Sequence, residues 1–196
     1  MTLILGSGSP RRREILSILG LDYRVVTADA DEHSDLTDPG ARVESIAAAK
    51  CAAVRDRLVR EGMDPADRDT LILTADTLVT IDGIFLGKPL DGDDATSMLA
   101  RLAGRTHTVA SGICLSLGGK TVTAHECTEV CFAPMTAEEI AAYVATGESF
   151  GKAGAYAVQG HAARYITGIR GDYFNVVGLP VRRLYETAAT VFGIYL

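Results

Sequence analysis

Apolar and polar positions alternate along the chain with two different periods, and this pattern predicts a succession of strands and helices. Short apolar runs bounded by glycine or polar residues predict strands, whereas apolar residues three or four positions apart predict helices. The expected strands cover residues 3–5, 23–26, 71–75, 77–81, 84–86, 109–117 and 121–132. The expected helices cover residues 10–19, 39–60, 91–102, 136–146 and 181–192. Their alternation predicts an α/β fold, and we expect one domain over residues 1–196 because no repeat or linker divides them.

Several of these elements begin or end at residues that favour such ends. Ser9 stands at an N-cap position before Pro10, and Gly20 follows the first helix where a glycine commonly ends one. Asp82-Gly83 and Gly118-Gly119 predict two hairpin turns between neighbouring strands. The first strand is therefore expected to pass through a tight loop directly into the first helix.

Composition narrows the classes of protein to which the chain can belong. Hydrophobic residues make up 47% and charged residues 22%, as in a globular protein. The net charge of −6 argues against a broad nucleic-acid surface but leaves room for a small anionic substrate. No apolar run approaches the roughly 20 residues that span a membrane, and the first residues lack a basic leader, so we expect a soluble protein. The four cysteines have neither CxxC nor zinc-finger spacing, as expected for reduced thiols in the cytoplasm.

The segment Ser7-Gly8-Ser9-Pro10-Arg11-Arg12 is the first candidate site. A glycine and two hydroxyls before a helix offer backbone N–H groups to an anion, which the helix dipole also favours. Two arginines at the helix start add permanently charged donors for phosphate oxygens. The segment is not a Walker A loop, and a plain helix cap with solvated arginines is the alternative interpretation.

Asp76 and Glu32 are the candidate acidic residues. Asp76 follows the buried run 71–75, where the strand is expected to end, and a carboxylate there is costly to desolvate without a cation or a catalytic role. A turn-capping aspartate is an equally good interpretation of Asp76 taken alone. Glu32 lies in a polar loop, where most glutamates are simply solvated.

The candidate cations besides the arginines are two lysines. Lys50 lies on the Ala-rich helix, where a lysine is usually at the surface, and Lys88 has a defined direction because Gly87 and Pro89 flank it. Four histidines share no spacing and are expected to be non-catalytic: His33, His107, His125 and His161.

A glycine-rich stretch supplies further candidates. Thr136 and Glu139 have the spacing of a capping box that opens a helix, and the segment 148–160 after that helix is expected to be irregular. Its glycines let backbone approach a ligand, Lys152 adds a cation, and Gln159 could bind a base edge through one donor and one acceptor. An ordinary loop glutamine is the alternative for Gln159.

Six blocks together resemble the Maf family, and they run in the family's order over nearly the whole chain. They are Ser9-Pro10-Arg11-Arg12, the helix around Lys50, Ala75-Asp76-Thr77, Gly87-Lys88-Pro89, the run 152–160 and the run 171–180. The resemblance implies a fold similar to that of inosine triphosphate pyrophosphatases: an elongated mixed sheet flanked by helices, with two lobes around a cleft. It also implies a nucleoside triphosphate pyrophosphatase that uses Mg²⁺ or Mn²⁺, and it suggests a homodimer.

The resemblance also implies roles for individual residues. Arg12, Thr77 and Gln159 stand at positions that divide the family's branches, and here they resemble the dTTP/UTP branch rather than the 7-methyl-GTP branch. We expect the metal at Asp76 and Glu32, with Asp76 as the base that activates water. The full expected set is Asp76, Lys50, Lys88 and Glu32 for catalysis, and Ser9, Arg11, Arg12, Thr77, Lys152 and Gln159 for substrate binding.

Two positions depart from the family's pattern, and other functions stay open. Gly151 stands where the family usually has an aspartate that could position Lys152 or a metal, and Ser45 replaces a common arginine. One alternative function is a pyrophosphatase for modified nucleotides, and another is a non-enzymatic regulator of septum formation. A general nucleic-acid-binding module fits the acidic balance least.

Overall fold

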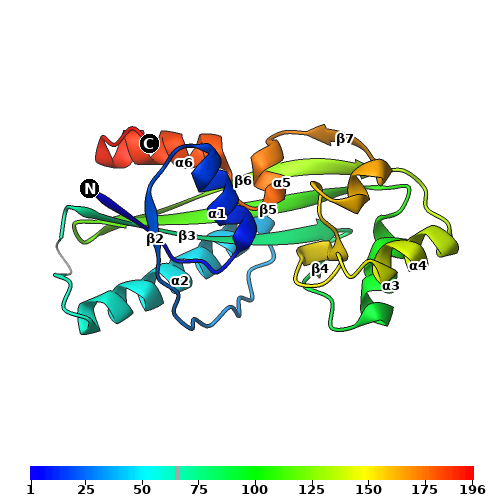
Figure 1. Cartoon of the computed structure of the whole chain (residues 1–196), viewed down its shortest axis with the longest axis horizontal. Coiled ribbons are helices and arrows are strands. Elements are labelled where there is room, and N and C mark those ends of the chain that lie inside the picture. The colour runs from blue at the N-terminus through cyan, green and yellow to red at the C-terminus, as the bar shows by residue number, and fades with distance from the viewer. Residues whose placement is uncertain (65–66) are drawn as a thin grey trace. The chain divides into compact units, whose positions relative to one another are not determined.

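Seven strands form one mixed sheet with helices against it in the computed structural model, which describes residues 1–64 and 67–196 (Figure 1). The strands are β1 (Thr2–Leu5), β2 (Tyr23–Val25), β3 (Thr70–Ile81), β4 (Ile84–Leu86), β5 (Thr106–Leu117), β6 (Lys120–Phe132) and β7 (Ile166–Arg170). The α-helices are α1 (Pro10–Ile18), α2 (Pro39–Arg60), α3 (Gly92–Leu102), α4 (Ala137–Ala145), α5 (Tyr173–Val177) and α6 (Val181–Phe192). Two short 3-10 helices are η1 (Ala153–Ala155) and η2 (His161–Tyr165).

The strand order is β2-β1-β3-β5-β6-β7, and β4 pairs with β3 beside this path. β1 is parallel to both β2 and β3, whereas β4 is antiparallel to β3 and β7 antiparallel to β6. Parallel strands require crossover connections, and α1 and α2 supply them here. The predicted α/β class with a mixed sheet flanked by helices is therefore confirmed.

The chain forms two compact units. Unit 1 comprises residues 1–76, 111–126 and 178–196, and unit 2 comprises residues 77–110 and 127–177. The division falls within the strands β3, β5 and β6. Two units agree with the two parts that the resemblance implies, while the single domain over residues 1–196 stays a prediction.

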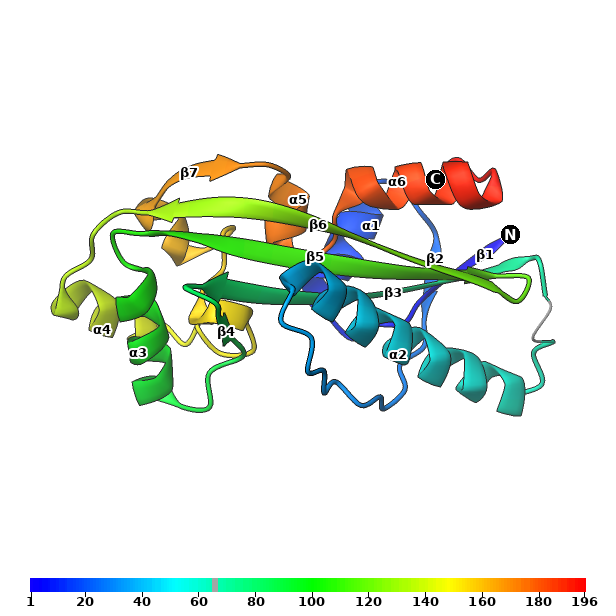
Figure 2. The same cartoon turned by 180° about the vertical axis from the view of Figure 1, so that it is seen from behind.

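In unit 1, α2 lies on one side of the strands and α6 on the other (Figure 2). Pro39 opens α2 behind the N-cap Asp38, whose side chain accepts a hydrogen bond from the amide of Ala41. A Cβ at Gly112 of β5 would lie 2.6 Å from the backbone of Val43, so only glycine lets α2 approach the sheet so closely. Main-chain contact thus sets the distance between α2 and the sheet.

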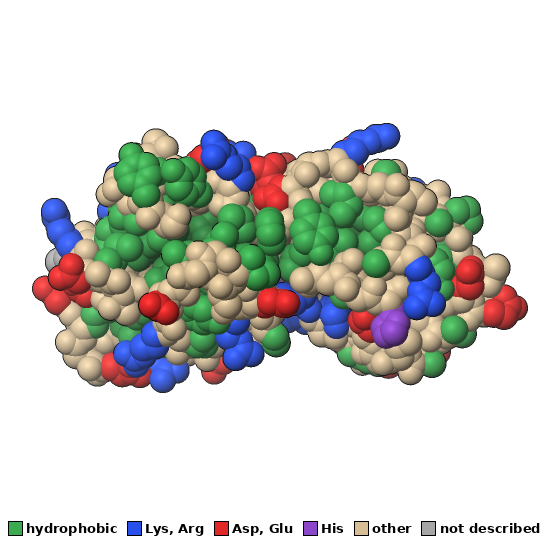
Figure 3. All heavy atoms as spheres, turned by 45° about the horizontal axis from the view of Figure 1, so that its top comes forward, with side chains coloured by type: hydrophobic (Ala, Val, Ile, Leu, Met, Phe, Trp, Pro, Cys, Tyr) green, Lys and Arg blue, Asp and Glu red, His purple; other side chains and the backbone are tan. Residues whose placement is uncertain are grey.

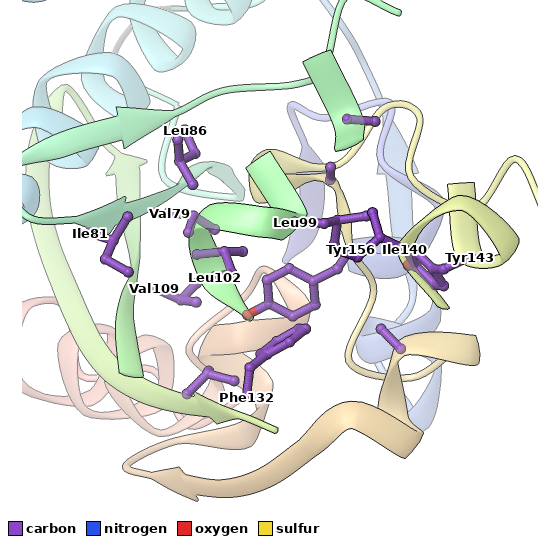
Figure 4. Close-up of a cluster of buried hydrophobic side chains, with 14 residues drawn as sticks. Val79, Ile81, Leu86, Leu99, Leu102, Val109, Phe132, Ile140, Tyr143 and Tyr156 are labelled. Carbon is purple, nitrogen blue, oxygen red and sulfur yellow. The ribbon is translucent and has the colours of Figure 1, made fainter. Parts of the chain in front are cut away.

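Unit 2 has its own apolar core (Figure 4). This core is built from the parts of β3, β4, β5 and β6 that belong to unit 2, from α3 and α4, and from the segment after α4. Leu99 and Leu102 of α3 are fully buried, and Tyr156 packs edge-on against Phe132 with 4.9 Å between ring centroids. His107 lies against the same rings, and its Nε2 is 2.7 Å from the hydroxyl of Tyr156. The aromatic cluster ties the glycine-rich segment to β5 and β6.

His107 should make the stability of the protein sensitive to acid. Burial lowers the pKa of His107 to about 4, whereas the imidazole in the unfolded chain takes up a proton at its ordinary value of 6.5. Stability from the neutral imidazole is therefore complete above pH 6.5 and is lost as the pH falls from 6.5 to about 4, by about 3 kcal/mol in the free energy of unfolding. Urea unfolding at pH 7 and pH 4.5 measures this loss.

The variant His107→Gln should lose less stability over the same pH interval, because glutamine does not titrate. His125→Gln is the matched control, since His125 is an exposed histidine paired with Glu44 on unit 1. Equal acid sensitivity in the wild type and in His107→Gln would contradict the assignment.

The structure differs from the sequence-based expectation at β3 and β7. We predicted that a strand ends at Asp76, but β3 continues through it to Ile81, because the residues on both sides of Asp76 keep an apolar, β-favouring pattern. Asp76 therefore lies within a strand, and the prediction of a strand end there was wrong. β7 was not predicted, since Gly168 interrupts a five-residue strand whose burial pattern does not alternate.

The surface carries both signs of charge on the face shown in Figure 3. On the face that Figure 3 presents, basic and acidic side chains are interspersed with apolar ones, and no continuous basic stripe crosses it. Across residues 1–64 and 67–196, no helix is long and apolar enough to cross a membrane.

Candidate active site

The carboxyl end of β1 lies beside the middle of β3 in unit 1. The two strands are parallel with Leu5 opposite Leu73, and the amide of Gly6 donates to the carbonyl of Leu73 over 2.7 Å. A Cβ at Gly6 would lie 2.5 Å from Cγ2 of Thr74, so glycine is needed where the chain leaves β1. In parallel sheets ligands bind beyond the carboxyl ends of strands, and α1 follows the end of β1 here. Asp76 lies within β3, three residues after Leu73.

The start of α1 carries the polar groups that the sequence predicted there. Ser9 is the N-cap, as predicted, but in the described chain its side chain makes no capping hydrogen bond, and the first turn holds no acidic residue. The amide of Ser9 instead donates to Oγ of Ser7 at 3.3 Å. The Ser9 hydroxyl is thus not used to cap the helix, which favours the phosphate interpretation over the plain-cap interpretation.

Arg12 is anchored on two sides. Its Nε donates to the carbonyl of Gly178 over 2.8 Å, and its Nη1 donates to Oγ of Ser7 over 3.0 Å. A guanidinium has five N–H donors in a rigid plane, so these contacts fix the orientation of that plane. The segment before α6, far along the chain, therefore orients an arginine near the N-terminus.

A contact between α2 and β3, formed by residues that precede Lys50 and Asp76, brings these two side chains together. Thr74 donates its hydroxyl to the carbonyl of Ala47 over 2.7 Å. Asp76 shares a strand face with Thr74, and Lys50 lies one turn after Ala47 on the same helix face. The result is an ion pair of 2.7 Å between Nζ of Lys50 and Oδ1 of Asp76, whose side chains are 17% and 15% exposed.

Glu32 completes this group from the loop after β2. Its Oε1 lies 3.1 Å from Nζ of Lys50, and its side chain is 56% exposed. One ammonium is therefore shared by two carboxylates, which are brought together from segments 44 residues apart. Lys50 is not the surface lysine that its helix alone suggested.

Arg12 lies within electrostatic reach of Asp76 and Glu32, and Arg11 lies within reach of Arg12. Burial lowers the pKa of the Arg12 guanidinium to about 10, while Asp76 raises it, Arg11 lowers it and Glu32 raises it. Burial also lowers the pKa of Arg11. Both arginines stay charged at neutral pH, so one region of unit 1 holds three cations and two carboxylates.

Comparisons with known proteins agree with this geometry. A family model described as "Maf-like protein" matches residues 2–191. The chain belongs to the Maf family. This Maf chain is 45% identical to the dTTP/UTP pyrophosphatase of Symbiobacterium thermophilum over 97% of its own length and 94% of that protein's. It is 47% identical to the dTTP/UTP pyrophosphatase of Moorella thermoacetica, over 98% of this chain and 95% of that protein.

The other predicted site residues of this Maf chain belong to unit 2. They are Thr77, Lys88, Lys152 and Gln159. Lys88 and Gln159 are exposed, and the amide of Gly154 donates to the carbonyl of Gly87 over 3.0 Å. This hydrogen bond places the residues around Lys88 beside the segment that contains Lys152. The structure thus gathers five predicted residues, Arg11, Arg12, Glu32, Lys50 and Asp76, in unit 1, with Ser9 at the start of the same helix as the arginines.

Lys152 contacts main-chain oxygens, although Gly151 stands where the family usually has an aspartate. Nζ of Lys152 donates to the carbonyl of Glu148 over 2.6 Å and lies 3.4 Å from that of Phe150. Gly151 has φ of +72°, a conformation that glycine adopts without strain. Lys152 is therefore positioned without a carboxylate at residue 151.

The supporting contacts of several residues were not predicted from the sequence. Ser7 and the carbonyl of Gly178 hold Arg12, and Thr74 holds α2. Asn175 is fully buried and donates to the carbonyl of Val109 and to the hydroxyl of Thr128, which fixes α5 in unit 2. The signal for Asn175 was available, since an amide inside an apolar run must have hydrogen-bond partners.

Proposed function

We propose that this Maf protein hydrolyses nucleoside triphosphates, dTTP and UTP foremost, to the monophosphate and pyrophosphate. The observation that carries the proposal is the convergence of Arg12, Lys50, Asp76 and Glu32 in unit 1. The names of the relatives supply the substrate class. A purely regulatory nucleotide-binding protein would have no need for two carboxylates around one lysine.

Phosphate binding falls to the start of α1 in this proposal. Arg11 and Arg12 supply permanent positive charge, and the hydroxyl of Ser9 and the first amides of the helix supply neutral donors. Because Arg12 is already fixed by Gly178 and Ser7, little side-chain entropy is lost when a phosphate arrives. The arrangement suits a polyphosphate, whose several charges need more than one cation.

Asp76 is proposed as the general base. Its Oδ1 accepts the hydrogen bond from Lys50, which orients the carboxylate and leaves Oδ2 to accept a proton from water. That water attacks phosphorus, and the bond between the α- and β-phosphates breaks to release pyrophosphate. Lys50 and the arginines offset the negative charge that develops on the phosphate oxygens.

The residues present fit a divalent metal ion. Asp76 and Glu32 bring two carboxylates to one point, where the ammonium of Lys50 now lies between them. Mg²⁺ is commonly held by one or two carboxylates with water and substrate phosphates. No group of three or more His, Cys, Asp or Glu side chains that could hold a metal occurs among the described residues, so phosphate oxygens would complete the coordination. Such an ion would supply Lewis-acid neutralisation of phosphate charge.

Selectivity for the base is proposed to lie with Thr77 and Gln159, and Lys88 and Lys152 are proposed as further cations for the substrate. These four roles rest on the resemblance and on the chemistry of the side chains. A homodimer and a cytoplasmic location likewise stay predictions.

Pyrophosphate release from a panel of triphosphates tests the proposed function. The panel contains dTTP, UTP, dCTP, dATP, dGTP and 7-methyl-GTP, each with Mg²⁺ and with Mn²⁺. We expect the highest kcat/KM for dTTP and UTP and dependence on the added metal. A preference for 7-methyl-GTP would point to the modified-nucleotide alternative, and no release from any triphosphate would refute the enzymatic assignment.

The variant Gln159→Ala should change the choice of base more than the rate with dTTP. A lost base contact is worth about 1–3 kcal/mol, so the preference for dTTP over dCTP should fall roughly tenfold or more. Measurement of kcat/KM for both nucleotides checks this, with His161→Ala as a control at a neighbouring exposed side chain. An unchanged nucleotide ranking would remove Gln159 from base recognition.

A further inference from the structure

The segment from Glu148 to Ala162 carries Lys152 and Gln159 but contains little regular structure. Between the end of α4 and β7, the described chain forms only the short 3-10 helices η1 and η2. A segment with so few repeating hydrogen bonds needs specific contacts to hold two functional side chains at a fixed separation. Glu148, which sequence reasoning did not single out, provides those contacts.

The carboxylate of Glu148 accepts three hydrogen bonds from two other parts of unit 2. The hydroxyl of Tyr143 on α4 donates to Oε1 over 2.7 Å. At the start of η2, the amide of His161 donates to Oε2 over 2.9 Å and the amide of Ala162 to Oε1 at 3.4 Å. One side chain thus joins α4 to the residues that directly follow Gln159.

The charge on Glu148 strengthens these bonds. Burial alone would raise the pKa of the Glu148 carboxyl, but the hydrogen bonds from Tyr143 and from the amides of His161 and Ala162 outweigh burial and lower the pKa. The group is therefore ionised at neutral pH. Hydrogen bonds to an ionised acceptor are about twice as strong as neutral ones.

The two ends of the segment both meet at Glu148. A Cβ at Gly160 would overlap the Glu148 carboxylate, so the residue next to Gln159 must be glycine for the contact to form. At the other end, the main-chain carbonyl of Glu148 accepts the hydrogen bond of 2.6 Å from Nζ of Lys152. The carboxylate and the carbonyl of one residue thus fix both functional positions.

We propose that Glu148 is a positioning residue that sets the placement of Gln159 relative to Lys152 and thereby the selectivity for the nucleobase. The proposal rests on the function proposed above. Glu148 acts through its neighbours and does not itself touch the substrate. The alternative is that Glu148 only stabilises α4, but that helix already has a capping box at Thr136 and Glu139.

Glu148→Gln is the variant that tests this role. Glutamine keeps the shape, but its amide nitrogen cannot accept a hydrogen bond. Either Tyr143 and the amide of Ala162 lose their shared acceptor, or the amide of His161 loses its acceptor. We expect KM for dTTP to rise roughly tenfold, because a small displacement of binding groups has a large effect, with a smaller change in kcat. The preference for dTTP over dCTP should fall as it does in Gln159→Ala. Tyr143→Phe, which loses one donor to Glu148, should show a smaller change in the same direction.

Two comparisons separate positioning from stability. Glu139→Gln weakens the capping box of the same helix and leaves Glu148 intact, so it should lower Tm without changing the nucleotide ranking. In the double variant of Glu148→Gln with Gln159→Ala, the loss of selectivity should be no larger than in Gln159→Ala alone, because both act through the same side chain. Additive losses of selectivity would overturn the proposal.

Tryptic cleavage after Lys152 supplies a readout that needs no activity. If Glu148 holds the segment, Glu148→Gln should be cut there several-fold faster than the wild type or Glu139→Gln. If the wild type hydrolyses dTTP but Glu148→Gln shows unchanged cleavage and an unchanged ranking of nucleotides, the positioning role is refuted and the proposed function still holds. If the wild type hydrolyses no nucleotide but trypsin cuts Glu148→Gln faster than the wild type, the proposed function is refuted. The result would still support a role of Glu148 in fixing the segment.

Discussion

Asp76→Asn is expected to lower kcat for dTTP by roughly a hundredfold to ten-thousandfold, the range that a general base contributes. Asparagine has the same shape and its carbonyl can still accept the hydrogen bond from Lys50, so folding and nucleotide affinity should be retained. What the variant lacks is an oxygen basic enough to accept a proton from water. Single-turnover pyrophosphate release, together with equilibrium binding of dTTP, separates the two effects.

Asp82→Asn is the matched control for Asp76→Asn. Asp82 is an exposed aspartate in a hairpin turn, paired with Arg105 at 2.7 Å, and asparagine suits its positive φ of +53°. That variant should keep wild-type kcat. A near wild-type rate in Asp76→Asn would show that another group activates the water.

Lys50→Met is expected to have the second largest effect, on both activity and stability. Methionine preserves the length of the side chain but removes the charge that Asp76 and Glu32 share, leaving two carboxylates without their common partner. Removing one member of a largely buried ion pair costs about 2–5 kcal/mol, and partial exposure here favours the lower end. We expect about 2 kcal/mol less stability to urea and a fall in kcat/KM of roughly a hundredfold.

Lys120→Met controls for the loss of one lysine charge. Lys120 lies 5.8 Å from the centre of the Phe192 ring at an exposed position, so its replacement should leave kcat/KM unchanged. If Lys50→Met retained full activity, the lysine would serve only to pair the carboxylates in the absence of substrate.

Local sequence signals were sufficient to predict those helix starts and turns that depend on neighbouring residues. The Ser9-Pro10 start of α1, the capping box of Thr136 and Glu139, and the turn at Asp82-Gly83 all depend on contacts within a few residues. These were predicted from side-chain chemistry and were confirmed. The family blocks then supplied the candidate residues that the structure gathers in unit 1.

Long-range contacts could not be predicted in the same way. Arg12 and its acceptor Gly178 are 166 residues apart, and Thr74 binds Ala47 across 27 residues. β3 was predicted to end at Asp76 because a carboxylate ends most buried runs, but a lysine from α2 neutralises it and the strand continues. In each case a partner on another element contributes to the outcome, and the sequence around the residue does not identify that partner.

The bond between Arg12 and the carbonyl of Gly178 also bears on how the protein is made. The guanidinium precedes its acceptor by 166 residues, so it is translated long before the acceptor. A nascent chain or a fragment that stops before residue 178 therefore contains every predicted catalytic side chain but lacks this anchor for Arg12. The start of α1 therefore depends for its full organisation on a segment that is translated 166 residues later.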